Sequence, residues 1–230
     1  MSERVPARAV VLDVNNTLID AFSAFAAIDI AFAHDAFGIT LTRERVRDLW
    51  GSTPDVVYNS LFQQYHRPWQ QVAEQFRQYR QDHSDVDAFQ PKVYPETIPA
   101  LTQLKAAGMV LCLATGGTPS VVYEDLERGG IAPDDWFDHI QFPIGDDPKP
   151  LTRVVVNLAR RGIGAPETVM VGDDSADRQA TLRAGLGRFI AVTTGPTMSR
   201  EDFLRVGVPA QDIAAHIGQV PGLILPPAAA

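Results

Sequence analysis

The chain has 230 residues, of which 45% are hydrophobic and 21% are charged, and its formal net charge is −8. This size and apolar content favour a globular protein with one main domain and room for a smaller second one. The acidic balance argues against broad binding to nucleic acids or anionic membranes, because both need basic patches.

The sequence carries no targeting or membrane signal. Its first residues, MSERVPARAVV, lack the apolar core and cleavage site of a signal peptide. The longest apolar stretch, AFSAFAAIDIAFA (residues 21–33), is interrupted by Asp29 and is too short to span a bilayer. The single cysteine, Cys112, lies inside an apolar run and cannot form an intrachain disulfide. We therefore expect a cytoplasmic protein, either a monomer or a homodimer.

Four short apolar runs have the composition of buried parallel strands. They cover residues 7–14, 109–115, 168–173 and 189–194, and residues 138–143 are a further candidate. Helical patterns lie between the runs, over residues 96–108, 120–130, 151–162 and 175–185. This alternation of strands and helices predicts an α/β fold with a doubly wound, Rossmann-like parallel sheet.

Residues 21–90 interrupt the alternation, because they are helical and rich in aromatic residues and contain no convincing strand. An insertion of this length after the first strand predicts a separate α-helical domain above the carboxyl ends of the strands. Residues 1–20 and 91–230 then form the core domain. We expect the aromatic side chains of the insertion to pack mainly against one another.

Polar residues gather where the predicted strands end, which is where ligands bind in open parallel sheets. The first strand is followed by Asp13 and Asn15, the second by Thr115, Gly116 and Gly117, and the third by Gly172, Asp173, Asp174 and Asp177; Asp147 and Lys149 precede a helix nearby. Clustered carboxylates need a cation between them, and their oxygen ligands suit Mg²⁺. A lysine, a hydroxyl and glycine amides can hold a phosphoryl oxygen. Taken alone, Asp174 could also simply cap the helix that follows it.

In this order, the motifs resemble those of the haloacid dehalogenase (HAD) superfamily. The segment Asp13-Val14-Asn15-Asn16-Thr17 is similar to the DxDxT motif except at one position, and Gly172–Asp177 is similar to the GDxxxD motif. Thr115 and Lys149 match the Ser/Thr and lysine positions that the superfamily has between these two motifs. With its helical insertion, the chain resembles members with a type-1 helical cap, close to phosphoglycolate phosphatases and β-phosphoglucomutases.

The resemblance implies a role for each matching residue. Asp13 is expected to attack a small phosphorylated metabolite and form an aspartyl-phosphate, with Thr115, Gly116, Gly117 and Lys149 binding the phosphoryl group. Mg²⁺ is expected to be bound by Asp13, the backbone carbonyl of Asn15 and Asp173, with help from Asp174 or Asp177. Gly51, Ser52 and Thr53 lie where relatives place a substrate-selecting loop.

The chain departs from the phosphatase pattern at Asn15, where these enzymes have an aspartate that protonates the leaving group and later activates water. An amide can do neither, and losing such a group typically costs about 10² to 10⁴ in rate. Several explanations stay open. The protein is a slow or specialised phosphatase that obtains its proton elsewhere (for example from His66, Tyr58 or Asp55), a weakly active phosphate-ligand-binding protein, or a non-phosphatase hydrolase such as a dehalogenase. Asn15 could also be an introduced substitution.

Overall fold

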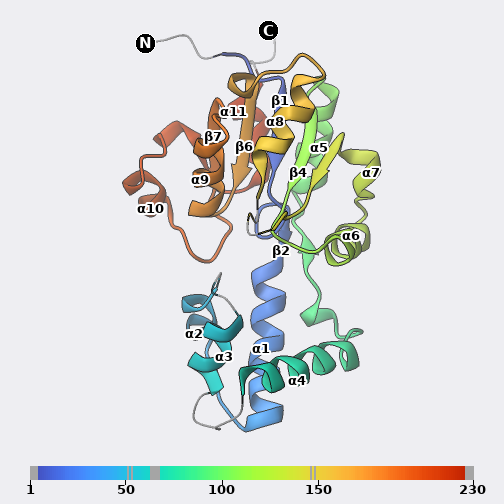
Figure 1. Ribbon diagram of the computed structural model, residues 1–230, viewed down its shortest axis with the longest axis vertical. Coiled ribbons are helices and arrows are strands. Elements are labelled where there is room, and N and C mark those ends of the chain that lie inside the picture. Colours follow the sequence, from blue (N-terminus) through green and yellow to red (C-terminus); the bar gives the residue numbers. More distant parts are fainter. Residues whose placement is uncertain are drawn as a thin grey trace. The chain divides into compact units, whose positions relative to one another are not determined.

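A computed structural model describes residues 5–50, 52, 54–62, 68–145, 147 and 149–225, without the side chains of residues 54, 55 and 62. Contacts divide the chain into two compact units: Met1–Asp20 with Lys92–Ala230, here called the core unit, and Ala21–Pro91, here called the helical unit. Figure 1 shows the elements of each unit. The unit boundary differs by one residue, Pro91, from the domain boundary expected from the sequence.

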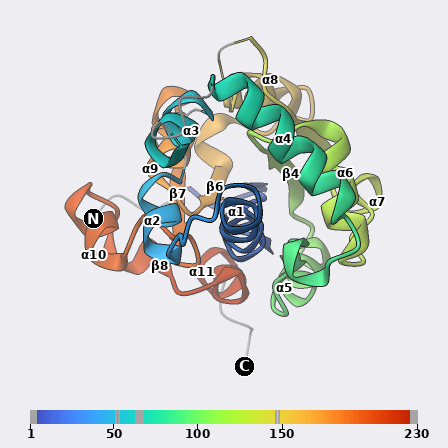
Figure 2. The same ribbon diagram turned by 90° about the horizontal axis from the view of Figure 1, so that it is seen from below.

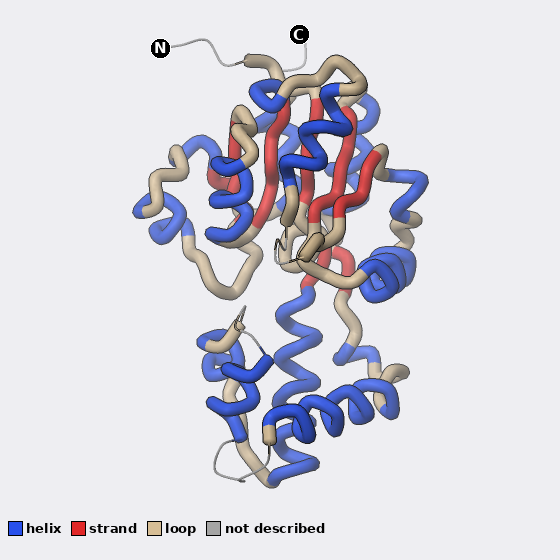
Figure 3. Tube along the Cα trace, in the orientation of Figure 1, coloured by secondary structure: helices blue, strands red, loops and turns tan. Residues whose placement is uncertain are grey.

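The core unit is built on a six-stranded sheet with the order β5-β4-β1-β6-β7-β8, in which every neighbouring pair is parallel. The predicted parallel α/β sheet is therefore confirmed, and Figure 3 shows its strands together. In chain order the strands are β1 (Ala9–Leu12), β4 (Val110–Ala114), β5 (His139–Gln141), β6 (Thr168–Gly172), β7 (Arg188–Val192) and β8 (Ile213–Ala214).

Helices cover both faces of this sheet (Figure 2). On one face α8 (Leu151–Ala159) packs against α9 (Ser175–Arg183), and on the other α5 (Thr97–Ala106) packs against α11 (Val220–Ile224). The remaining helices of the core unit are α6 (Pro119–Arg128), α7 (Pro133–Trp136) and α10 (Arg200–Arg205), with short 3₁₀ turns η3 (Ala165–Glu167), η4 (Ala210–Asp212) and η5 (Ile217–Gln219).

Apolar sequence accounts for the central strands. All four residues of β1 are buried, as are all five of β6, because both of their faces carry helices. Cys112 belongs to this core, and burial raises the pKa of its thiol to about 12. The thiol is therefore protonated and inert at neutral pH.

A second, two-stranded antiparallel sheet joins β2 (Ile19–Asp20) to β3 (Lys92–Val93), the two points where the chain leaves and re-enters the core unit. Neither of these strands, nor β8, was predicted. Each has only two residues, and a two-residue strand is too short to show the alternation by which strands are recognised.

The helical unit contains α1 (Ala21–Phe37), α2 (Arg43–Asp48), α3 (Pro54–Phe62), α4 (Trp69–Asp82) and the 3₁₀ turn η2 (Asp87–Phe89). Its aromatic rings pack mainly against one another. The Phe32 ring, for example, meets Phe37, Phe76 and Tyr79 edge-on, at centroid distances of 5.1–5.5 Å. Within the described residues, no helix is long and apolar enough to cross a membrane.

Candidate active site

The order of the strands brings the candidate residues to one edge of the sheet. Strand β1 lies between β4 and β6, so the chain runs first toward one side of the sheet and later toward the other. Ligands bind where the strand order reverses in this way, just beyond the carboxyl ends of the strands. Asp13, Thr115 and Asp173 follow directly after β1, β4 and β6.

Three carboxylates form the centre of the site. Asp13, Asp173 and Asp177 each offer one oxygen, and these oxygens all lie within 4.8 Å of one another. The three residues are 3%, 5% and 0% exposed. Three acids buried this close repel one another strongly unless positive charge lies among them.

Lys149 supplies part of that charge. Its Nζ donates a 2.7 Å hydrogen bond to Asp13 Oδ1 and also donates to Asp177 Oδ1. Burial alone would lower the pKa of Lys149, but the neighbouring carboxylates of Asp13, Asp177 and Asp174 raise it above its ordinary value. The ammonium therefore stays charged, and it binds the two acids from one side.

One ammonium does not balance three carboxylates. Burial raises the pKa of Asp177 to about 8, although Lys149 acts against this shift. Burial, followed by the charges of Asp13 and Asp177, also raises the pKa of Asp173 well above its usual value. Among the residues that the structure describes, the Asp173 carboxyl has no hydrogen bond or ion pair. These hard oxygen donors and their unbalanced charge fit a divalent cation.

Local backbone structure fixes Asp13 and its turn. The Asp13 N–H donates to the carbonyl of Val171 in β6 at 2.9 Å, and the hydroxyl of Thr17 donates to Asp13 Oδ2 at 3.1 Å. Asn16 turns the chain with a left-handed φ of 58°, a conformation that asparagine tolerates better than most residues. Asn15 is half-buried in this turn and forms an isolated bridge with Ile19.

Asp174 lies next to the three-carboxylate cluster and is not a member of it. Its side chain is the N-cap of α9 and accepts the N–H of Asp177 at 3.0 Å, while Asp177 Oδ2 accepts the N–H of Asp174 at 3.3 Å. This reciprocal capping box holds Asp177 in the first turn of the helix, where it reaches Lys149.

Thr115 and the two glycines form the turn between β4 and α6. Thr115 is buried, and its Oγ1 accepts the N–H of Gly117 at 3.1 Å. A Cβ on Gly117 would lie 2.7 Å from Val122, so a larger residue would force this turn apart. Gly116 is exposed and has open space where its Cβ would stand.

Two residues near the cluster were missed from the sequence. A Cβ on Gly195, which follows β7, would lie 2.0 Å from Asp173 Oδ2. Thr194 donates from its hydroxyl to the carbonyl of Asn16. Neither residue has a sequence signal of its own, because both contacts arise only when β6 pairs with β1 and β7.

Several residues expected near the substrate belong to the helical unit. Ser52 is exposed there, whereas Gly51 and Thr53 lie outside the described residues. Of the three alternative proton sources, His66 and the Asp55 side chain are also outside them. Tyr58 packs into the core of the helical unit, and burial raises its pKa to about 12.

Fold and site together define an α/β protein with a buried cluster of three carboxylates and a lysine at the carboxyl edge of its sheet. The sequence pattern of the haloacid dehalogenase-like hydrolases matches residues 10–192, and the chain belongs to this family. The family resemblance expected from the motifs is thereby confirmed.

Individual relatives agree with this assignment. The chain is 29% identical to the phosphoglycolate phosphatase of Rhodobacter capsulatus over 133 residues, which are 56% of this chain and 58% of that protein. It is 42% identical to the glyceraldehyde 3-phosphate phosphatase of Methanocaldococcus jannaschii over 83 residues, 35% of each protein. The matches thus span little more than half of the first relative and about a third of the second.

Solved structures support the fold. A haloacid dehalogenase-like family hydrolase from Streptococcus pneumoniae superimposes with a TM-score of 0.71 over 95% of this chain and 99% of that one. Its sequence identity is 17%, so this likeness concerns the fold alone.

Proposed function

We propose that this chain is a magnesium-dependent phosphohydrolase that passes the phosphoryl group of a small phosphorylated metabolite first to Asp13 and then to water. The observation that carries the proposal is the position of Lys149, whose ammonium contacts Asp13 and Asp177 beside the carboxyl of Asp173, which has no partner among the described residues. The names of the two curated relatives support a small phosphorylated metabolite as the substrate.

Asp13, Asp173 and Asp177 would hold the Mg²⁺ ion, together with the backbone carbonyl of Asn15, and Asp174 would support them through its capping bond to Asp177. Once bound, the cation would balance the carboxylates and draw negative charge from the phosphoryl oxygens. The helical unit would act as the cap that selects the substrate, with Gly51, Ser52 and Thr53 in its selecting loop.

In the first step a carboxylate oxygen of Asp13 attacks phosphorus, and the bond from phosphorus to the leaving oxygen breaks as the new bond forms. Lys149 places positive charge next to Asp13, where the phosphoryl oxygens would lie. Thr115 Oγ1 already accepts the N–H of Gly117, so its own proton remains to be donated to the substrate, alongside the N–H of Gly116.

In the second step water attacks the phosphorus of the aspartyl-phosphate, which releases inorganic phosphate and regenerates the Asp13 carboxylate. Asn15 can neither protonate the leaving oxygen in the first step nor take a proton from water in the second. Substrates whose leaving group departs as a stable anion avoid the first difficulty. The second remains, so the phosphorylated form of Asp13 should be long-lived.

Asn15 also favours a second candidate function, a phosphate-ligand-binding protein with little turnover. A dehalogenase-like activity is a weaker alternative, because such enzymes need no metal, whereas Asp173 and Asp177 here lie next to Asp13.

The test is phosphate release from a panel of phosphate esters with Mg²⁺, measured for the unchanged chain, for Asn15→Asp and for Asp13→Asn. Hydrolysis predicts release that Asp13→Asn abolishes. If only Asn15→Asp releases phosphate, the binding function is the better account of the natural chain. Hydrolysis and phosphate-ligand binding would both be wrong under two conditions. Neither the unchanged chain nor Asn15→Asp releases phosphate, and beryllium fluoride with Mg²⁺ fails to raise the melting temperature.

A further inference from the structure

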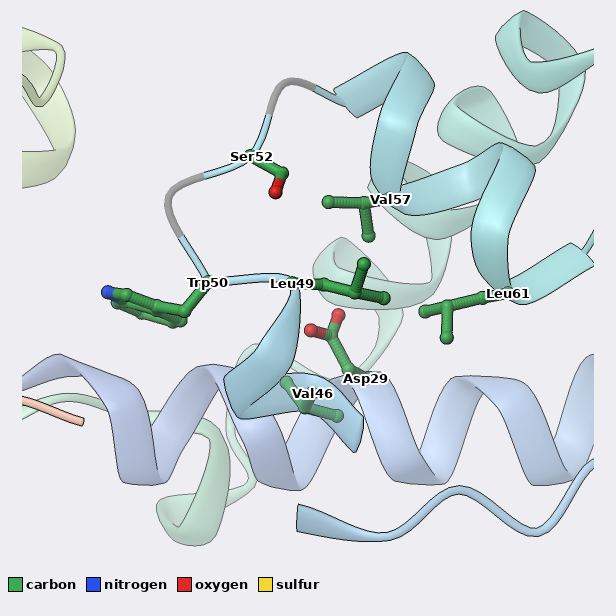
Figure 4. A pocket seen from close by; sticks show the side chains of 7 residues that line it. All are labelled: Asp29, Val46, Leu49, Trp50, Ser52, Val57 and Leu61. Carbon is green, nitrogen blue, oxygen red and sulfur yellow. The ribbon is translucent and has the colours of Figure 1, made fainter. Parts of the chain in front are cut away.

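A second acidic site lies entirely within the helical unit and does not depend on the proposed function. A cavity of about 160 Å³ is lined by residues of α1, α2 and α3 together with Leu49, Trp50 and Ser52. Figure 4 shows the carboxyl group of Asp29 pointing from α1 toward Leu49. The rest of the lining comes from Val46, Leu49, Trp50, Ser52, Val57 and Leu61.

Asp29 is an acidic residue in a cavity lining that is otherwise mostly apolar. It interrupts an apolar helix whose neighbours Ile28 and Phe32 are buried, and it faces four aliphatic side chains. In the part of the chain that the structure describes, its carboxyl has no hydrogen bond or ion pair. A carboxylate placed against an apolar wall without a partner is costly, and an apolar residue would be expected in its place if packing were the only requirement.

The positive charge near Asp29 does not offset the effect of its burial. Burial raises the pKa of Asp29 to about 7, and the charge of Arg80 on α4 only partly opposes this shift. The Arg80 guanidinium lies over the ring of Phe25, 4.9 Å from its centroid, rather than against the carboxyl. A second cation at Asp29 would therefore be stabilised, because it would supply both a hydrogen bond and the missing charge.

We propose that this cavity is a binding site for a small organic cation, in which the carboxylate of Asp29 pairs with a primary ammonium group and the aliphatic walls hold a short hydrocarbon body. The size is suitable, because an apolar cavity of about 150 Å³ accommodates benzene. A neutral alcohol of the same shape would offer only the hydrogen bond and should bind more weakly.

The probe is n-butylammonium, with 1-butanol as its neutral counterpart, titrated into the ¹⁵N-labelled full chain and followed by amide chemical shifts. We expect n-butylammonium to perturb amides of α1, α2 and α3 with a millimolar Kd of about 1 to 10 mM, as befits so small a ligand. 1-Butanol should bind at least tenfold more weakly.

Three variants separate the contributions. Asp29→Asn keeps the shape of the side chain but removes its charge, and should weaken n-butylammonium at least tenfold. Val57→Phe fills the cavity without changing any charge and should also abolish binding, which tests the site even if Asp29→Asn fails to fold. Asp35→Asn is the matched control. It removes the same charge from the same helix, but Asp35 is exposed and bonded to Tyr79 and His34 instead of facing the cavity.

The proposal is overturned if no shifts appear up to about 50 mM probe, which would mean that the cavity holds only water. It is equally overturned if 1-butanol binds as well as n-butylammonium, or if Asp35→Asn weakens binding as much as Asp29→Asn does.

Discussion

Gly195 and Asp173 approach each other so closely that a single methyl group could not fit between them. A Cβ on Gly195 would lie 2.0 Å from Oδ2 and 2.8 Å from Cγ of Asp173. Asp173 is buried at the end of β6, so its carboxyl has little room to move aside. The loop after β7 thus controls the position of a side chain in the acidic cluster.

Gly195→Ala should therefore displace the Asp173 carboxyl and weaken divalent-cation binding roughly tenfold or more. The measurement is the Mg²⁺ concentration that gives half of the maximal rise in melting temperature. Gly222→Ala in α11 is the matched control, because its new methyl group would meet nothing within 4 Å. Equal Mg²⁺ midpoints for the two variants would show that Asp173 does not bind the cation.

The Lys149 ammonium should be essential to the stability of the metal-free protein. Lys149→Met leaves the carboxylates of Asp13 and Asp177 buried without their shared partner, which we expect to cost about 3 to 5 kcal/mol of unfolding free energy. Urea unfolding in EDTA measures this loss, and added Mg²⁺ should recover part of it. Lys105→Met, which removes an exposed lysine from α5, should change stability little. Equal losses of unfolding free energy for the two variants would contradict the charge-balancing role of Lys149.

Asn15 should make the first step, the phosphorylation of Asp13, depend strongly on the leaving group. We expect Asn15→Asp to accelerate the hydrolysis of alkyl phosphates by about 10² to 10⁴, because their leaving oxygen needs a proton. Formation of the phosphorylated enzyme from acetyl phosphate should change far less, since acetate departs without one. Quenched-flow measurement of both steps distinguishes these effects. An equal acceleration of the first step with alkyl phosphates and with acetyl phosphate would mean that Asn15 affects something other than proton transfer to the leaving group.

Asp29 should make the helical unit less stable as the pH rises. Its pKa is about 7 in the folded protein against 3.8 as an unperturbed group, so the folded state holds the proton more tightly. The stabilisation is then fully present below about pH 4 and is lost as the pH rises through 7, by up to about 4 kcal/mol.

Hydrogen exchange of α1–α3 amides between pH 5 and pH 8, corrected for intrinsic exchange rates, measures this loss. Asp29→Asn should flatten the profile, because every other titratable group is common to the two proteins. Arg80 and Tyr58 are the charged and titratable neighbours of Asp29, and burial raises the pKa of Tyr58 to about 12, so Tyr58 stays protonated over this range. Parallel profiles for the two proteins would contradict the prediction.

Most elements of the core unit could be predicted from the sequence, because each strand and helix has a recognisable local pattern. The apolar runs that became β1, β4, β6 and β7 are buried on both faces, and Gly108 ends α5 with a left-handed φ of 76°, as a C-cap glycine should. Motif spacing also predicted that Asp13, Lys149 and Asp173 meet at neighbouring strand ends, where Lys149 contacts Asp13 and the carboxylates of Asp13 and Asp173 lie close together.

What the sequence could not give depends on contacts between distant segments. Asp174 caps α9, whereas Asp177 accepts a hydrogen bond from Lys149. These different roles follow from helix geometry and from the path of the Lys149 side chain. Gly195 is an ordinary loop glycine until β7 pairs with β6. Asp29 was visible only as a charge inside an apolar run, because the cavity that it faces is made by three separate helices.

The pairing of β2 with β3 has a consequence for how such a protein can change. Asp20 and Lys92 are cross-strand partners, so the chain departs and returns at points about 5 Å apart. The 71 residues between them connect β2 to β3 in the same way as the loop of a β-hairpin connects its two strands. They could be exchanged for another insertion, or shortened to a tight turn, without reordering a single strand of the core.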